Sequence, residues 1–160
     1  MGKKVAIDNY PLWVALMRTH YFLRKLREKE LKKIGLSMAQ STVLAIIHST
    51  KNTQADSTPA EISKQLLKAP STTTELIDRM VEQGMVRKVQ DLERRNMVRV
   101  EMTELGEELH SQSRQVEYFS KIFSKVTPRR RQSLITYLDT LGDAAIKTMY
   151  KNAKRLASLD

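Results

Sequence analysis

The chain contains no cysteine, which excludes disulfide bonds, thiolate metal sites and redox sensing through a thiol. Its five glycines, Gly2, Gly35, Gly84, Gly106 and Gly142, are scattered, so they assemble no glycine-rich phosphate loop or dinucleotide-binding fingerprint. No nucleophile stands in a recognisable setting with a base and an orienting group. We therefore expect a protein that is not an enzyme and that needs no cofactor.

Long apolar runs are also missing. The longest, Val43 to Ile47, is far shorter than the roughly 20 residues that a membrane span requires. The first seven residues contain too short an apolar stretch for a signal peptide. We expect a soluble, cytoplasmic protein without membrane association.

Positive charge is present in excess. The 160 residues include 28 Lys and Arg against 18 Asp and Glu, which leaves a formal net charge of +10. Such a balance favours a polyanionic partner and argues against an acidic interaction domain. The length suits one domain, or one intertwined protomer, with a buried core. Nucleic acid is therefore the first partner to consider.

Capping signals mark where the first helices begin and end. Residues 9–34 have a helical apolar period, and Gly35 follows as a residue suited to ending a helix. Ser37 and Gln40 have the spacing of a capping box and predict a second helix to about residue 49. Thr58 followed by Pro59 predicts the start of a third helix. The apolar positions expected in the core are Val43, Leu44 and Ile47 on the second helix, and Ile62, Leu66 and Leu67 on the third.

The stretch 58–103 has the element order of a winged helix-turn-helix. A helix over residues 71–83 follows the third helix, and Gly84 ends it. Two alternating strands, 85–90 and 97–102, then flank the charged turn 91–96. Such a unit places one helix in a DNA major groove and a cationic hairpin in a minor groove. The side chains expected to face inward are Thr73, Leu76, Ile77, Met80, Val81, Val98, Val100 and Met102, whereas Arg99 and Glu101 face outward.

The C-terminal third is expected to be helical. Thr103 predicts the start of a helix that runs to about Lys125, and Thr127 with Pro128 predicts the start of the last helix. Its apolar positions repeat at helical spacing at Leu134, Ile135, Leu138, Leu141 and Ile146. The last helix and the 9–34 helix each carry more apolar surface than one small domain can bury. This excess predicts that both helices pair with their counterparts in a twofold homodimer. The alternative is a self-contained helical bundle.

The fold prediction is mainly α with a small β-hairpin wing. Residues 1–160 form a single protomer, in which residues 37–102 are the winged helix-turn-helix DNA-binding region. The N- and C-terminal helices, residues 9–34 and 103–157, form a dimerisation region. A dimer would place two recognition helices about one helical turn of DNA, or a multiple of it, apart. The expected target is therefore a pseudo-palindromic double-stranded DNA operator.

Two stretches carry a resemblance to a known family. One runs from Asp78 to Val86 across the end of the 71–83 helix. The other joins an acidic, arginine-bearing wing to a helix start of the form Leu-Thr-x-x-Gly, and is matched by Asp91, Arg95, Val98, Val100, Met102, Thr103 and Gly106. Over essentially its whole length the chain resembles the MarR family of bacterial transcription regulators. It departs from that pattern at Arg94 and Asn96, where the family usually has a second aspartate and a second arginine.

The predicted DNA contacts lie on the 71–83 helix and on the hairpin. Short hydroxyls and open backbone amides at a helix start suit phosphates and base edges, and arginines at a hairpin tip suit a narrow minor groove. On the helix the candidates are Ser71, Thr72, Thr74, Glu75 and Arg79; on the wing they are Arg94, Arg95, Arg87, Lys88 and Arg99. The alternatives are a capped helix whose threonines merely cover surface, a Glu75–Arg79 pair and a solvated charged turn.

The resemblance also implies an effector site. Family members typically bind small aromatic or amphipathic molecules between the dimerisation and DNA-binding regions, which typically releases DNA. The residues predicted to line such a cavity are Trp13, Met17, His20, Tyr21, His48, Val116, Phe119 and Phe123, and the alternative is that they are plain core. The three histidines, His20, His48 and His110, lie on different predicted helices with no two at i, i+4, so no metal site is expected.

These observations predict a homodimeric, sequence-specific transcriptional regulator. Repression is the simplest mechanism, in which the dimer blocks a promoter until a small aromatic or amphipathic effector loosens it. Two alternatives remain open: a protein-interaction adaptor that reuses the winged fold, and a non-specific DNA-binding protein without effector control.

Overall fold

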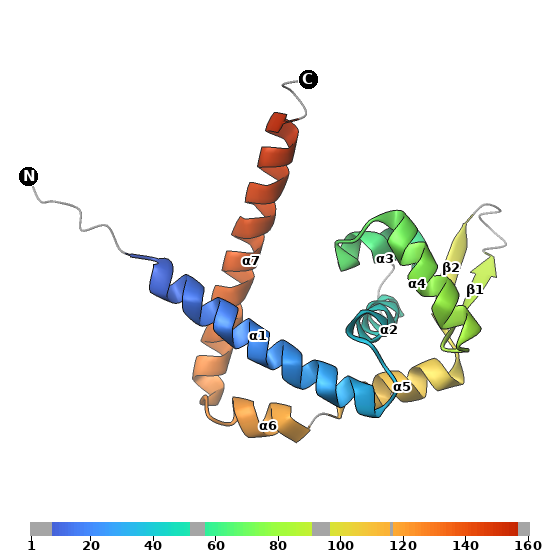
Figure 1. Ribbon diagram of the computed structural model, residues 1–160, viewed down its shortest axis with the longest axis horizontal. Coiled ribbons are helices and arrows are strands. Elements are labelled where there is room, and N and C mark those ends of the chain that lie inside the picture. Colours follow the sequence, from blue (N-terminus) through green and yellow to red (C-terminus); the bar gives the residue numbers. More distant parts are fainter. Residues whose placement is uncertain (1–7, 52–56, 91–96, 116, 157–160) are drawn as a thin grey trace, which may run out of the picture. The chain divides into compact units, whose positions relative to one another are not determined.

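The computed structural model describes residues 8–51, 57–90, 97–115 and 117–156. They form helices α1 (Tyr10–Lys33), α2 (Met38–Thr50), α3 (Pro59–Leu66), α4 (Pro70–Glu82), α5 (Glu104–Arg114), α6 (Glu117–Phe123) and α7 (Pro128–Leu156), with strands β1 (Val86–Gln90) and β2 (Val98–Met102) (Figure 1). The prediction of a mainly helical chain with one hairpin is confirmed. None of the described helices has the length and apolar character needed to cross a membrane.

The chain divides into two compact units, one ending at Gln115 and one beginning at Val116. In the first unit α2 lies at the centre, in contact with α1, α3, α4, α5 and β2 (Figure 1). α2 is apolar enough to be buried on several sides at once. Burying a side chain such as Leu44 contributes about 1.5–3 kcal/mol to the free energy of unfolding. The core of this unit consists of Leu31, Leu36, Val43, Leu44, Ile46, Ile47, Ile62, Leu76, Ile77, Met80, Met85, Val86, Val100 and Met102.

The caps predicted for the first unit are confirmed. The Ser37 hydroxyl accepts from the Gln40 backbone N–H at 3.2 Å, and the Gln40 side chain accepts from the Ser37 N–H at 2.8 Å. The Thr58 hydroxyl accepts from the Glu61 N–H at 3.2 Å. Gly35 and Gly84 have φ values of +73° and +70°, a left-handed conformation that ends α1 and α4 at low cost because glycine lacks a Cβ.

Three side chains predicted to be buried are exposed. Leu67 is 68% exposed because α3 ends at Leu66 and Leu67 turns into the left-handed region with φ +52°, which takes its side chain off the apolar face. Val81 is 37% exposed, since it follows Met80 around the helix and leaves the face that Met80 buries. Val98 is 38% exposed because it pairs with Gln90 at the tip end of the hairpin, beyond the core.

The hairpin is a two-stranded antiparallel sheet. Its register pairs Val86 with Met102 at the base and Gln90 with Val98 towards the tip. The predicted alternation holds at the base, where Val100 and Met102 are buried and the Glu101 between them is half-buried. The inward face of the hairpin is therefore confined to the end nearest α5.

The helix predicted from Thr103 to Lys125 is interrupted, so that prediction was wrong. α5 ends at Arg114, and Gln115 has the non-helical angles φ −82° and ψ +70°. No glycine or proline marks this point in the sequence. The guanidinium of Arg27 on α1 instead donates to the Ser113 carbonyl at 2.5 Å and so takes up a carbonyl of the last turn. A contact between residues 86 positions apart therefore helps to end this helix.

The second unit contains α6 and α7. α7 begins at Pro128, directly after Thr127, as predicted, and the Arg131 N–H donates to the Thr127 carbonyl at 2.9 Å. On α6 the rings of Phe119 and Phe123 lie 5.8 Å apart between centroids. The apolar stripe of α7 is exposed to between 43% and 51%, at Leu134, Ile135, Leu138, Leu141 and Ile146.

Candidate nucleic-acid interface

The first turn of α4 presents polar groups to solvent. The helix begins at Pro70, one residue earlier than predicted, and its N-cap is Ala69, whose methyl group cannot cap. The hydroxyls of Thr73 and Thr74 donate to the Ala69 and Pro70 carbonyls at 3.2 and 3.0 Å, so neither serves as the cap that its residue type favours. The first-turn amides are therefore without a side-chain acceptor from the N-cap, which leaves them suited to an anion.

The residues predicted to contact DNA from α4 lie on one side of the helix. Thr73 is fully buried, as predicted from its spacing to Ile77. The alternative in which Glu75 holds Arg79 is not seen, because these two described residues form no ion pair. The exposed residues are Ser71, Thr72, Thr74, Glu75 and Arg79. Their accessibility matches the predicted role, which remains a prediction.

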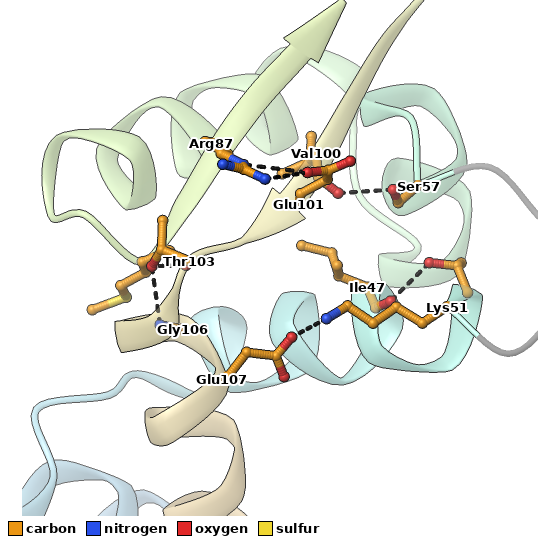
Figure 2. Close-up of polar contacts among 11 residues, drawn as sticks. Ile47, Lys51, Ser57, Arg87, Val100, Glu101, Thr103, Gly106 and Glu107 are labelled. Atoms are coloured by element: carbon orange, nitrogen blue, oxygen red, sulfur yellow. Dashed lines mark hydrogen bonds and ion pairs between the residues drawn. The ribbon is translucent and has the colours of Figure 1, made fainter. Parts of the chain in front are cut away.

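Two of the predicted hairpin cations are held by carboxylates. Arg87 on β1 donates to Glu101, its cross-strand partner on β2, from Nε at 3.2 Å and from Nη2 at 2.9 Å (Figure 2). The Lys88 ammonium contacts Asp78 on α4 at 2.5 Å. Exposed pairs of this kind contribute about 0–1 kcal/mol, so phosphate can replace either carboxylate at little cost. Sequence reasoning missed both ion pairs, which orient the two cations.

The remaining predicted wing residues are placed differently. Arg99 lies half-buried on β2, in register with Val89 of β1. Arg94 and Arg95 lie in the turn 91–96, outside the residues that the structure describes. DNA contact by Arg94 and Arg95 therefore remains a prediction.

Hydrogen bonds at Thr103 fasten the base of the wing. The Thr103 hydroxyl donates to the Gly84 carbonyl at 2.6 Å and accepts from the Gly106 N–H at 3.1 Å (Figure 2). The Thr103 N–H donates to the Met85 carbonyl at 3.1 Å. A Cβ on Gly106 would lie 2.1 Å from that same Met85 oxygen. One threonine and one glycine therefore bring the end of α4, the hairpin and the start of α5 together.

Ser57 ties the segment before α3 to the wing. Its hydroxyl donates to the Val100 carbonyl at 2.7 Å, and the Val100 N–H donates to the Ser57 carbonyl at 2.9 Å (Figure 2). Ser57 thus pairs the backbone N–H and carbonyl of Val100 on the outer edge of β2. The hairpin is fixed from both sides, which limits its freedom relative to α4.

A pair of histidines lies between α2 and α5. The rings of His48 and His110 are 4.5 Å apart between centroids, and His110 is only 6% exposed. Within the described residues, Nδ1 of His48 and both ring nitrogens of His110 have no hydrogen-bond partner. Burial, followed by the nearby His48 and Arg114, lowers the pKa of His110, and Glu107 opposes this shift. Beside the pair, Lys51 on α2 forms an ion pair with Glu107 on α5 (Figure 2).

A hollow of about 390 Å³ lies beside the histidine pair, between α2 and α5. Of the predicted effector-pocket residues that the structure describes, only His48 lines it. Its described lining is His48, Glu107, His110, Ser111, Arg114 and Gln115. On α1, Trp13, Met17, His20 and Tyr21 are exposed, while Phe119 and Phe123 belong to the second unit and Val116 lies outside the described residues. No three His, Asp or Glu side chains gather as a metal site in the described part of the chain.

Comparisons with known proteins agree with this architecture. Residues 34–95 match the profile of the MarR family. The HTH-type transcriptional repressor IacR of Pseudomonas putida is 29% identical over 137 residues, which cover 84% of this chain and 78% of that protein.

Two solved structures share the fold. A mutant MarR from E. coli, complexed with operator DNA, superimposes with a TM-score of 0.69 at 22% identity, and the match covers 84% of this chain and 97% of that one. The organohalide-sensing regulator RdhR in its 2,4-dichlorophenol-bound form gives a TM-score of 0.67 at 20% identity, with 90% and 85% covered.

The family match spans α2, α3, α4 and β1, which include the exposed helix start and the first strand of the cationic hairpin. The sequence resemblance to this family is thereby confirmed, and with it the expectation of a protein that regulates transcription and is not an enzyme. The winged helix-turn-helix region of this chain matches the MarR family, and the chain is similar over 137 residues to a transcriptional repressor.

Proposed function

We propose that this regulator is a homodimeric repressor, that it binds a pseudo-palindromic operator, and that a small aromatic or amphipathic effector releases it. The observation that carries the proposal is the exposed, uncapped first turn of α4 beside a hairpin of fixed cations. The relative IacR is named a transcriptional repressor, and the structure of the E. coli MarR mutant contains operator DNA. Both support the same role for this chain.

In the proposed complex α4 lies in the major groove. Ser71, Thr72 and Thr74 meet phosphates and base edges with hydroxyls and amides, while Glu75 and Arg79 extend the contact along the exposed face. Arg94 and Arg95 enter the adjacent minor groove, where negative potential attracts guanidinium groups. Arg87, Lys88 and Arg99 serve phosphates, and the first two exchange their carboxylate partners for them.

The proposed dimer uses the terminal helices. The α7 stripe around Leu138 is exposed, and α1 exposes Tyr10 to 70%, Trp13 to 59% and Phe22 to 57%. Burying one such side chain stabilises an assembly by about 1.5–3 kcal/mol. Association with a second copy of the chain would bury these side chains and is therefore favourable. Residues 9–34 and 103–157 are accordingly proposed as the dimerisation region and residues 37–102 as the DNA-binding region, all within the single protomer 1–160.

The proposed effector is a small aromatic or amphipathic molecule. RdhR is solved with 2,4-dichlorophenol, which supports a ligand of phenolic size for this chain. The proposed contacts are Trp13, Met17, His20, Tyr21, His48, Val116, Phe119 and Phe123. Binding there would change the separation of the two recognition helices and so lower operator affinity.

A footprint on the DNA upstream of the protein's own gene tests this proposal. A homodimer protects two symmetric half-sites whose centres lie about one helical turn, roughly 10–10.5 base pairs, or a multiple of it apart. Adding an aromatic effector from a panel of phenols and aryl carboxylates removes that protection. One asymmetric protected patch, or a monomeric mass in light scattering at micromolar concentration, contradicts the dimeric arrangement.

A further inference from the structure

A pair of glutamines joins the central helix α2 to the C-terminal end of α4, the proposed recognition helix. Gln40 on α2 is 9% exposed, and its Nε2 donates to Oε1 of Gln83 at 2.6 Å. Gln83 is the C-cap of α4, and its backbone N–H donates to the Arg79 carbonyl at 3.0 Å. The contact spans 43 positions of sequence and lies at the end of α4 opposite the turn that faces solvent.

The orientation of the Gln40 amide is fixed by its surroundings. Its Oε1 accepts from the Ser37 N–H, which can only donate, so its Nε2 must be the group that faces Gln83. The same amide therefore completes the capping box of α2 and holds the end of α4. Because the Gln40 side chain is buried, loss of the Gln83 acceptor leaves Gln40 Nε2 unsatisfied.

This hydrogen bond restricts the orientation of α4 more strongly than apolar packing does. The inner face of α4, at Ile77 and Met80, packs on the core through non-directional contacts that tolerate small rotations. The Gln40–Gln83 bond links α4 to α2 through a directional contact that involves none of the proposed phosphate ligands. α4 has 13 residues and is about 20 Å long, so a rotation at its C-terminal end moves its first turn relative to base edges.

We propose that Gln40 and Gln83 are positioning residues that set the angle of the recognition helix and thereby determine operator specificity. The proposal rests on the proposed DNA-binding role of α4. Neither residue contacts DNA: they hold the helix whose first turn reads it. Their loss lowers the preference for operator over unrelated DNA, whereas the phosphate contacts that dominate non-specific affinity stay in place.

Two isosteric substitutions separate this role from a general effect on stability. In Gln83→Glu, a carboxylate oxygen still accepts from Gln40 Nε2. In Gln40→Glu, one oxygen still accepts from the Ser37 N–H, while the Gln83 amide rotates and donates to the other. Each single variant keeps the bond. The double variant places two carboxylates against each other, and their repulsion breaks it.

The experiment measures the ratio of affinities for operator and scrambled duplex, with each variant first checked by circular dichroism and thermal unfolding. We expect each single variant to keep the wild-type ratio within about threefold and the double variant to lose about tenfold or more, a typical coupling for contacting residues. The slope of log affinity against log salt stays unchanged, since phosphate contacts are kept. The two single variants are the charge controls, because each adds one carboxylate and keeps the bond.

A double variant with the wild-type ratio, or one that weakens operator and scrambled DNA equally, overturns the proposal. If the double variant is not folded, Gln83→Ala is compared with Gln83→Glu, since Gln83 is exposed and its truncation removes only the acceptor. The expected result is that alanine lowers the ratio by about threefold or more and glutamate restores it; equal ratios overturn the proposal. A wild-type protein without operator preference would instead refute the proposed function.

Discussion

Replacing Gly106 with alanine tests the account of the wing base. A Cβ at this position would lie 2.1 Å from the Met85 carbonyl oxygen and 3.2 Å from the Met102 Cβ. The backbone oxygen cannot turn away freely, because the Thr103 N–H donates to it at 3.1 Å. The start of α5 must therefore move from the hairpin by about 1 Å to restore an ordinary contact.

The expected magnitude follows from two opposing effects. Alanine favours a helix over glycine by about 1 kcal/mol. Forcing a methyl group against fixed backbone costs about 3 kcal/mol, the upper part of the range for overpacking. We expect the free energy of unfolding of Gly106→Ala to fall by about 2 kcal/mol as the sum of these terms.

Urea denaturation followed by circular dichroism, at one fixed protein concentration, measures the change. Ser111→Ala is the matched control, because Ser111 is exposed on the same helix and makes no described hydrogen bond; it should stay within about 0.5 kcal/mol of wild type. A Gly106→Ala protein as stable as the control, or more stable, refutes the reasoning about the close approach.

Three further predictions concern the cap, the buried histidine and the wing. Thr103→Val removes the hydroxyl that caps α5 and bonds Gly84, and should lower the free energy of unfolding by about 1–2 kcal/mol in the same assay; no change would contradict the cap's role. Because the pKa of folded His110 is lowered from 6.5, the unfolded chain binds more protons, so stability is full above about pH 6.5 and falls as the pH drops below it. Denaturation between pH 5 and 8 should show this slope, and His110→Phe should reduce it; equal slopes would count against the assignment. Arg95→Ala should weaken operator binding by about tenfold or more without unfolding the dimer, measured by fluorescence anisotropy, with unchanged binding as the contrary result.

Features within a few residues of each other were predicted well from the sequence. The Ser37 and Thr58 caps, the glycine that ends α4 and the inward Thr73 all depend on neighbours within one helical turn. The hairpin followed from alternation along two short strands. Local rules therefore sufficed for the order of elements and for the exposed helix start.

Contacts between distant residues were not predictable in this way. The Arg27–Ser113, Gln40–Gln83 and His48–His110 contacts join residues 86, 43 and 62 positions apart, and no periodicity encodes such a pairing. The carboxylates that hold Arg87 and Lys88 were missed for the same reason. Leu67 looked apolar and in phase, but its left-handed backbone removed it from the core.

The most direct test of the central claim is a binding titration of the purified protein against the DNA upstream of its own gene and a length-matched scrambled duplex, at two salt concentrations. We expect tight binding to the upstream fragment, a strong preference over the scrambled duplex, and an affinity that falls steeply with salt because phosphate contacts release counterions. Equal, weak binding to both duplexes, or no binding even at low salt, would contradict a sequence-specific regulator of its own promoter.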